Sequence, residues 1–345
     1  MNRRIQKKKF HDERCKKLSR KSKIKRKKNN YYNVNENINH NSGRKYTKRV
    51  QKDAPRIFSF FDNPIDTIDF FDDIIIDIKR KIFGKTFFIN SSQVEEVSVD
   101  VLIYLIAIMQ NISINMQMQY SFIGNIPKNA DAAKIYLESG FMDYVSAKVK
   151  KLPKNNDKRR IVYGNSSDPV RASEFCKFVM DKLNVDRVSI QPIQKILIEL
   201  MSNVYHHAYK KDQDDIMKKK WYLYAECNKD RVKFIFVDTG VGIPKTVRKK
   251  FGERIASLFN SDIVSDAELI YSTLSGDFRT ETNELYRGNG LPGVYKLAQQ
   301  EPIMRFELIS GRGKCTIVND GTIKKEEFAN AICGTIFVFD VGVKG

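Results

Sequence analysis

The nine residues FIFVDTGVG, positions 234–242, decide the fold of the larger part of this chain. Four apolar residues typical of a buried strand lead into Asp238, and Gly240 and Gly242 follow at once. An ionised Asp only accepts hydrogen bonds, which suits an amine donor on a ligand. Glycines let the backbone approach a flat ligand closely. The same pattern is also typical of an ordinary turn after a strand, so the surrounding sequence must decide between the two interpretations.

The neighbouring segments predict an antiparallel sheet with helices on one face. A strand is expected at 221–227, and the four residues between it and the strand at 232–238 predict a hairpin. Further strands are expected at 304–309, 315–318 and 335–341, and helices at 168–183 and 192–209. Strands covered by helices on one face form a two-layer α/β sandwich, which we expect over residues 161–345.

The predicted helix at 192–209 carries Glu199 and Asn203 one turn apart, and therefore on one face. An amide oxygen can complete the oxygen shell that Mg²⁺ prefers. A carboxylate can orient or deprotonate a water molecule aimed at a phosphate. A Glu and an Asn on an amphipathic helix more often face solvent, so the pair alone does not define a site.

A glycine-rich loop, RGNGLPG at 287–293, opens another predicted helix. Pro292 suits a first helical turn, and the bare amides of a helix N-terminus bind phosphate. The loop lacks the Gly-Lys-Ser/Thr of a Walker A motif and does not follow the strand of a βαβ unit, which excludes both common phosphate-binding loops. Near the end of the chain, Gly334 and Thr335 open the last predicted strand.

In this order, Glu-x-x-x-Asn, Asp-x-Gly-x-Gly, Gly-x-Gly-Leu and Gly-Thr resemble the N, G1, G2 and G3 boxes of the GHKL superfamily of gyrase, the heat-shock chaperone, histidine kinases and MutL. The resemblance covers about residues 168–341 and implies a Bergerat-type fold that binds ATP and Mg²⁺. It implies that Asn203 holds Mg²⁺ and that Glu199 activates water. It also implies that Asp238 accepts a hydrogen bond from the adenine amine, with Thr335 nearby through water.

By the same resemblance, Gly240 and Gly242 shape the floor under the adenine. The residues expected around the phosphates are His206, Gly288, Gly290 and Leu291. Residues 244–286 then form a polar lid that we expect to be mobile until nucleotide binds, and within it Arg279 and Thr280 can contact phosphate.

Residues 57–150 predict a small α/β module, followed by a polar linker at 151–160. Its strands are expected at 85–89 and 120–123, and its helices at 99–109 and 130–138. The module resembles the STAS-like domain that precedes the ATPase in a bacterial group of stand-alone GHKL proteins. Ser98 only loosely matches the loop serine that such domains present to kinases.

Residues 1–53 hold 20 Lys and Arg against 4 Asp and Glu, which accounts for +16 of the net charge of +20. Such a segment is expected to be disordered, because it cannot bury enough apolar surface to offset its chain entropy. It suits either an arm that contacts nucleic-acid phosphates or a solubilising tail.

Three functions remain open. The first is a slow Mg²⁺-dependent ATPase that acts as a nucleotide-controlled switch on a protein partner. The alternatives are a serine kinase of the anti-sigma-factor type and an ATP-regulated nucleic-acid-binding module. A sensor histidine kinase is disfavoured because the four His residues fall in the basic tail or the N box. A gyrase-like enzyme is disfavoured because no transducer domain is expected after the last strand. Five scattered cysteines and the absence of a long apolar run predict a cytoplasmic protein without a membrane partner.

Overall fold

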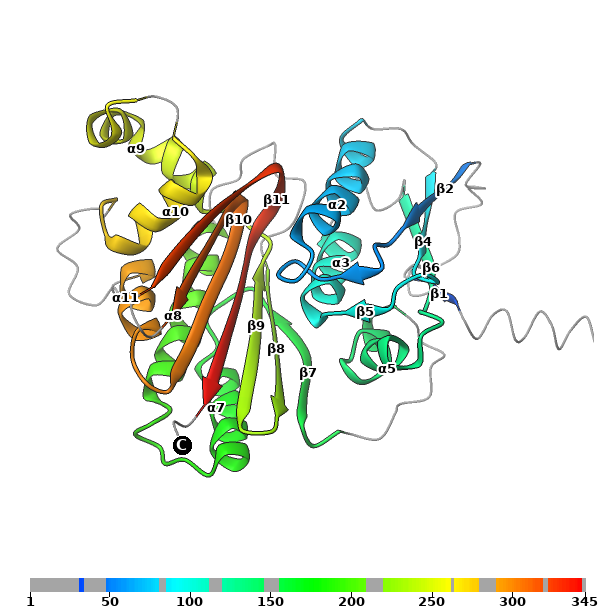
Figure 1. Cartoon of the computed structure of the whole chain (residues 1–345), viewed down its shortest axis with the longest axis horizontal. Helices are drawn as coiled ribbons and strands as arrows, with labels where there is room; N and C mark the ends of the chain where they lie inside the picture. The colour runs from blue at the N-terminus through cyan, green and yellow to red at the C-terminus, as the bar shows by residue number, and fades with distance from the viewer. Residues whose placement is uncertain are drawn as a thin grey trace, which may run out of the picture.

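The structure is a computed structural model that describes residues 31–33, 48–80, 85–111, 120–145, 155–208, 220–261, 264–278, 290–318 and 322–342. These residues form a mixed α/β protein with two main sheets (Figure 1). We call residues 31–33 and the described part of 48–145 the N-terminal module. We call the described part of 155–342 the larger domain.

The module's main sheet has the order β1-β6-β4-β2, and its strands β6, β4 and β2 run parallel to one another. β1 lies antiparallel at one edge, and the chain alternates strand and helix from β2 to β6, as βαβ units do. The strands of this sheet are β1 (Tyr31–Asn33), β2 (Lys48–Asp53), β4 (Lys85–Asn90) and β6 (Tyr120–Asn125). The helices are α2 (Pro64–Lys79), α3 (Val99–Asn111), α5 (Ala130–Glu138) and α6 (Met142–Val145), and the short strands β3 (Ile57–Phe58) and β5 (Glu96–Val97) pair in parallel.

The expectation of disorder over residues 1–53 is wrong for β1 and β2, which belong to this sheet. Lys52 shows the reason. Its side chain is buried and forms ion pairs with Asp73 and, at 2.9 Å, with Asp77, both on α2. The prediction of disorder treated the charge of this lysine as exposed to solvent. In the fold, two carboxylates neutralise it. The other residues expected to be disordered lie outside the described part.

The larger domain has a five-stranded antiparallel sheet in the order β10-β11-β9-β8-β7. Its strands are β7 (Lys158–Gly164), β8 (Trp221–Asn228), β9 (Arg231–Asp238), β10 (Ile303–Val318) and β11 (Ile323–Gly342). Its helices are α7 (Pro169–Leu183), α8 (Gln191–Ala208), α9 (Ile243–Phe259), α10 (Asp266–Ser275) and α11 (Gly290–Ala298). The β8–β9 hairpin and the helices α7 and α8 are confirmed. The expected linker at 151–160 is wrong at its end, because residues 158–160 begin β7.

β10 and β11 do not run as one straight ladder. The Thr316 hydroxyl donates to a carboxylate oxygen of Glu307 at 3.0 Å, although nine residues separate the two. An extended strand would place them about 30 Å apart, so the chain turns back on itself between them. The pairing with β11 shifts at Gly311 and again before Gly313, which locates the turn. The two strands expected at 304–309 and 315–318 are therefore the two arms of β10.

Both faces of the larger sheet are buried. Phe234 and Phe236 of β9 belong to the core shared with α7, α8 and α11, whereas Ile235 and Val237 belong to the core shared with the N-terminal module. Successive side chains on a strand point to opposite faces, so each face has its own covering layer. The expected helices do cover one face, and α2 and α3 of the module cover the other (Figure 1). The continuous apolar run of β9 in the sequence reflects this double burial.

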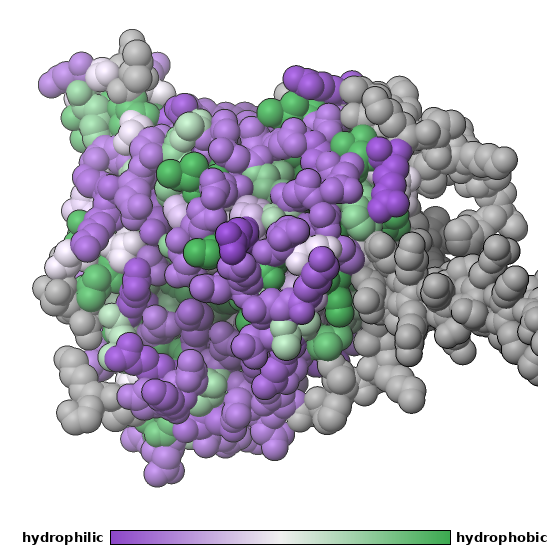
Figure 2. Space-filling view, turned by 45° about the vertical axis from the view of Figure 1, so that its right-hand side comes forward, coloured by the Kyte–Doolittle hydropathy of each residue, from purple (hydrophilic) through white to green (hydrophobic). Residues whose placement is uncertain are grey.

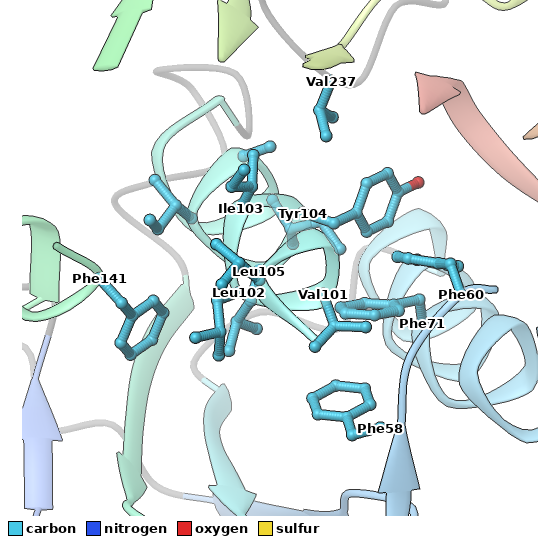
Figure 3. Packing of buried hydrophobic residues seen from close by; sticks show 14 of the residues in the cluster. Phe58, Phe60, Phe71, Val101, Leu102, Ile103, Tyr104, Leu105, Phe141 and Val237 are labelled. Carbon is cyan, nitrogen blue, oxygen red and sulfur yellow. The ribbon is translucent and has the colours of Figure 1, made fainter. Parts of the chain in front are cut away.

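The module and the larger domain share one hydrophobic core. Figure 3 shows Val237 pointing from its strand toward Ile103 and Tyr104 of α3, beside the stacked rings of Phe60 and Phe71. The face in Figure 2 is mostly hydrophilic, with small, separate hydrophobic areas. Within the described ranges, no helix is long and apolar enough to cross a membrane.

Candidate functional site

Polar residues gather where β9 ends beside the irregular middle of β10 and β11. Asp238, the last residue of β9, lies directly opposite Thr335 of β11, and Thr335 lies opposite Ser310 of β10. Gly334 precedes Thr335 in the chain. We call Asp238, Ser310, Gly334 and Thr335 the strand-end cluster. Residues far apart in the sequence are thus brought together by strand pairing alone.

The strand-end cluster belongs to the helix-covered face of the sheet. Asp238 follows Phe234 and Phe236 at two-residue intervals, and these two residues pack against the helices. Thr335 stands in the same relation to Phe337, which packs in the same core. Because side chains alternate along a strand, Asp238 and Thr335 share the side of the sheet on which α8 and α11 lie.

Asp238 is half-buried, and its carboxyl is held by hydrogen bonds. Its Oδ1 accepts from the Gly240 amide at 2.8 Å, and the Thr335 side chain also bonds to it. Burial raises the pKa of Asp238 to about 6, and the two hydrogen bonds act against that rise. The group is therefore ionised at neutral pH, as an acceptor for an amine must be.

Two glycines allow the segments around the strand-end cluster to meet. Gly334 has φ +84°, and a Cβ on it would lie 2.1 Å from the Asp238 carbonyl oxygen. Gly242 has φ +87°, and its Cβ would lie 3.1 Å from Ser310 Oγ. A side chain at either position would be strained and crowded, so the predicted glycine pattern has a structural cause.

Sequence reasoning missed Ser310, which is fully buried. Its Oγ accepts from the Ile243 amide at 2.9 Å and donates to the Gly334 carbonyl at 3.0 Å, and it lies 3.0 Å from the Thr335 hydroxyl. One hydroxyl thus joins β10, β11 and the start of α9. The available signal was a serine followed by glycine at the end of an apolar strand, which is weak without knowledge of the pairing.

On α8, Glu199 and Asn203 are half-buried and one turn apart. The helix is held to the sheet by its apolar face, including Leu200 and Met201. Asn203 Nδ2 is buried with no hydrogen-bond partner, and within the described ranges Asp100 Oδ2 of the N-terminal module is the other such side-chain atom. A buried polar atom without a partner is costly and calls for an explanation such as a ligand.

Oxygen and nitrogen of a side-chain amide have the same shape, so the unpaired end of Asn203 can equally present the oxygen that a cation needs. The part of the chain that the structure describes contains no cluster of three or more His, Cys, Asp or Glu able to hold a metal by themselves. Mg²⁺ usually takes one or two protein oxygens together with water and phosphate oxygens. Asn203 fits that arrangement.

The glycine-rich loop is only partly described. Gly288 lies outside the described residues, as does the side chain of His206, whose backbone is in the last turn of α8. Gly290 begins α11 with φ +57°, and a Cβ on it would meet no atom of the described residues within 4 Å. Leu291 packs against the core that also holds α8, which puts the start of α11 on the same side of the sheet as Asn203.

The expected lid at 244–286 is wrong in part. Its middle forms α10, whose Leu269 and Ile270 are fully buried, so this segment is a fixed part of the helical layer. Asp266 anchors α10, because its carboxylate pairs with Arg248 of α9 and accepts from the Arg312 amide at 2.7 Å. The predicted phosphate contacts Arg279 and Thr280 lie outside the described residues.

The structure thus brings Asp238 into contact with Gly240 and Thr335, and it places Gly242 beside Ser310 and Gly334. It puts Glu199, Asn203, Gly290 and Leu291 on the helices of the same face. Comparison with known proteins adds no further constraint: no protein-family model matches the chain, and no curated protein matches its sequence.

Proposed function

We propose that the larger domain binds ATP with Mg²⁺ in a Bergerat-type pocket and hydrolyses it slowly. One observation carries the proposal: the half-buried Asp238, at the end of β9, lies on the same side of the sheet as the buried, unpaired Nδ2 atom of Asn203. An antiparallel sheet with helices on one face supports the GHKL assignment. The parallel strands of the N-terminal module, with one antiparallel edge strand, are compatible with a STAS-like fold.

The adenine end of the pocket is the strand-end cluster. The Asp238 carboxylate accepts a hydrogen bond from the exocyclic amine, and Thr335 reaches the base through water. A Cβ on Gly240 would lie 2.9 Å from Asp238 Oδ1, so the glycine keeps that carboxylate free of a crowding side chain, and Gly242 lets the chain pass close to Ser310. The polar groups that bind the base are already fixed to one another before the ligand arrives, which reduces the free energy lost in ordering them.

The phosphate end lies at α8 and α11. Asn203 provides an oxygen for Mg²⁺, which neutralises charge on the phosphates when it is bound. The first amides of α11 donate hydrogen bonds to phosphate oxygens, as helix N-termini do. Leu291 fixes that end of the helix in the core.

Glu199 acts as the general base. Its carboxylate takes a proton from a water molecule, whose oxygen forms a bond to the γ-phosphorus while the bond from that phosphorus to the β–γ bridging oxygen breaks. The products are ADP and inorganic phosphate. Slow turnover of this kind suits a switch. The state of the protein that a partner binds then depends on the bound nucleotide and not on the rate of hydrolysis.

Calorimetric titration of the full chain with ATP and Mg²⁺ tests the proposal. Asp238→Asn is expected to weaken binding at least tenfold, because a buried charged acceptor is lost. Asp277→Asn is the matched control, since that aspartate is exposed at the end of α10. An unchanged dissociation constant for Asp238→Asn, or no binding by the unmodified protein, would refute the assignment.

The rate of phosphate release distinguishes the role of Glu199 from that of Asp238. Glu199→Gln is expected to abolish phosphate release while leaving the dissociation constant of ATP within about threefold, because the base acts on water and not on the ligand. Phosphate release at the normal rate by this variant would show that Glu199 is not the base.

A further inference from the structure

Tyr104 reaches from the N-terminal module into the larger domain. It lies on α3, is almost fully buried, and points toward the larger sheet in Figure 3. Its hydroxyl donates to the carbonyl of Cys333 at 3.1 Å and accepts from the amide of the same residue at 2.8 Å. One side chain of the module thus binds both backbone groups of one residue of β11.

Cys333 lies at an irregularity of the sheet. Pairing of β11 with β9 begins at Thr335, and pairing with β10 passes from Thr335 directly to Ile332. Cys333 and Gly334 therefore form a bulge that no neighbouring strand continues. Buried backbone amides and carbonyls need partners, and at Cys333 the Tyr104 hydroxyl supplies both.

The bulge leads directly into the strand-end cluster. Gly334 follows Cys333, and its carbonyl accepts from Ser310 Oγ at 3.0 Å. Thr335 comes next and bonds to Asp238. Bulges beside a site re-aim the side chains that follow them, so the geometry of this bulge sets the direction of Thr335.

We propose that Tyr104 is a positioning residue for the nucleotide base, acting from the N-terminal module through the Cys333–Gly334 bulge. The inference rests on the proposed ATP site and adds a second element to it. The module then supports the pocket from the opposite face of the sheet and is not a domain that detaches, in keeping with the core that it shares with the larger sheet. Because linkage is reciprocal, nucleotide binding strengthens the Tyr104 bridge by the same factor as the bridge strengthens binding.

Tyr104→Phe removes the hydroxyl and keeps the ring. Tyr136→Phe is a matched control, since Tyr136 is a fully buried tyrosine of the same module whose hydroxyl bonds instead to Ser91 Oγ, 3.0 Å away. Both variants are expected to lower the unfolding temperature. Tyr104→Phe is expected to weaken ATP binding about tenfold and to reduce the preference for ATP over GTP, whereas Tyr136→Phe should change neither by more than about twofold.

A loss of affinity that is equal in the two variants, or no loss in Tyr104→Phe, would overturn the inference while leaving the ATP site intact. If the unmodified protein fails to bind ATP, the proposed function and this inference both fall. Hydrogen exchange on the unmodified protein gives a second measurement that needs no variant. ATP should slow exchange of the Cys333 amide and leave that of α5, which carries Tyr136, unchanged; equal rates at Cys333 with and without ATP would contradict the bridge.

Discussion

At the scale of single residues, Asp238 meets opposing demands. Burial raises the pKa of its carboxyl to about 6, so the ionised form that binding needs is also the form that the interior disfavours. A group with a raised folded pKa contributes stability below its unfolded pKa of about 4 and loses it as pH rises to about 6. At neutral pH the apo protein therefore carries a charged group at a cost in stability, as functional sites often do.

Asp238→Asn should consequently stabilise the apo protein while it weakens nucleotide binding. We expect the free energy of unfolding at neutral pH to rise by about 1–2 kcal/mol, since a neutral amide of the same shape removes the cost of burying charge. Urea unfolding with and without ATP measures both effects. A variant that is less stable than the unmodified protein would show that the carboxylate is structural.

The affinity for adenosine should fall as pH drops below about 6, because the protonated Asp238 carboxyl is a poorer acceptor for the adenine amine. Adenosine is the preferred ligand here because it has no phosphate that titrates in the same range. Calorimetry at about pH 5 and about pH 8 should show roughly tenfold weaker binding at the lower pH. In Asp238→Asn this difference should vanish; its persistence would assign the titration to another group.

Residue types in the sequence predicted much of the candidate site but not all of it. Asp238 and Gly242 stand close together in the chain, so a local pattern predicts that they lie close in space. Ser310 and Tyr104 act through strand pairing and layer packing over long sequence separations. No local pattern in one sequence reveals such contacts, since the residues themselves are common in any core.

At the scale of elements, the turn of β10 fixes the helical layer. Gly311 and Gly313 bring the turn against the start of α10, where the Asp266 carboxylate accepts from the Arg312 amide. The sequence predicted the two arms of β10 but not this contact. The element that a turn packs against depends on the direction that the chain takes after the turn. The same contact explains why α10 is not part of a mobile lid.

Gly313→Ala should destabilise the protein by about 2–3 kcal/mol, because the new Cβ would lie 2.3 Å from the Ala267 amide nitrogen of α10. Gly252→Ala in α9 is the control, as its Cβ would meet no atom within 4 Å in the part of the chain that the structure describes. That substitution should be neutral or stabilise by up to about 1 kcal/mol through helix propensity. Urea midpoints of the two variants test the contrast, and similar midpoints would argue against the tight contact.

At the scale of the whole molecule, the protein is built from four layers. The helices of the larger domain, its sheet, α2 and α3, and the module's sheet follow one another (Figure 1). The sequence predicted two α/β units but not that one would cover the free face of the other. Apolar runs such as that of β9 indicate burial on both faces without indicating which element provides the second cover.

Removal of residues 1–154 should therefore prevent the larger domain from folding as a soluble monomer. The deletion exposes the apolar face made of Tyr222, Tyr224, Ile235, Val237, Ile336 and Val338. We expect aggregation and binding of a hydrophobic dye. Removal of residues 1–30 is the control, since every described residue is retained. A cooperative, monomeric 155–345 fragment would contradict the shared core.

The deletion of residues 1–30 is also the variant that tests the basic tail. Deletion as far as residue 53 would remove β1 and β2, and any loss of DNA binding would then reflect damage to the module's sheet. Deletion of residues 1–30 alone should lower DNA affinity and its salt dependence if the tail binds phosphates.

The central claim is that Asp238 and Asn203 serve one nucleotide, and a crystal structure of the full chain with Mn²⁺ and a non-hydrolysable ATP analogue tests it most directly. The account predicts the adenine amine about 3 Å from the Asp238 carboxylate, and the anomalous signal of the metal about 2 Å from the Asn203 side chain. Nucleotide bound elsewhere, or a metal remote from Asn203, would contradict it.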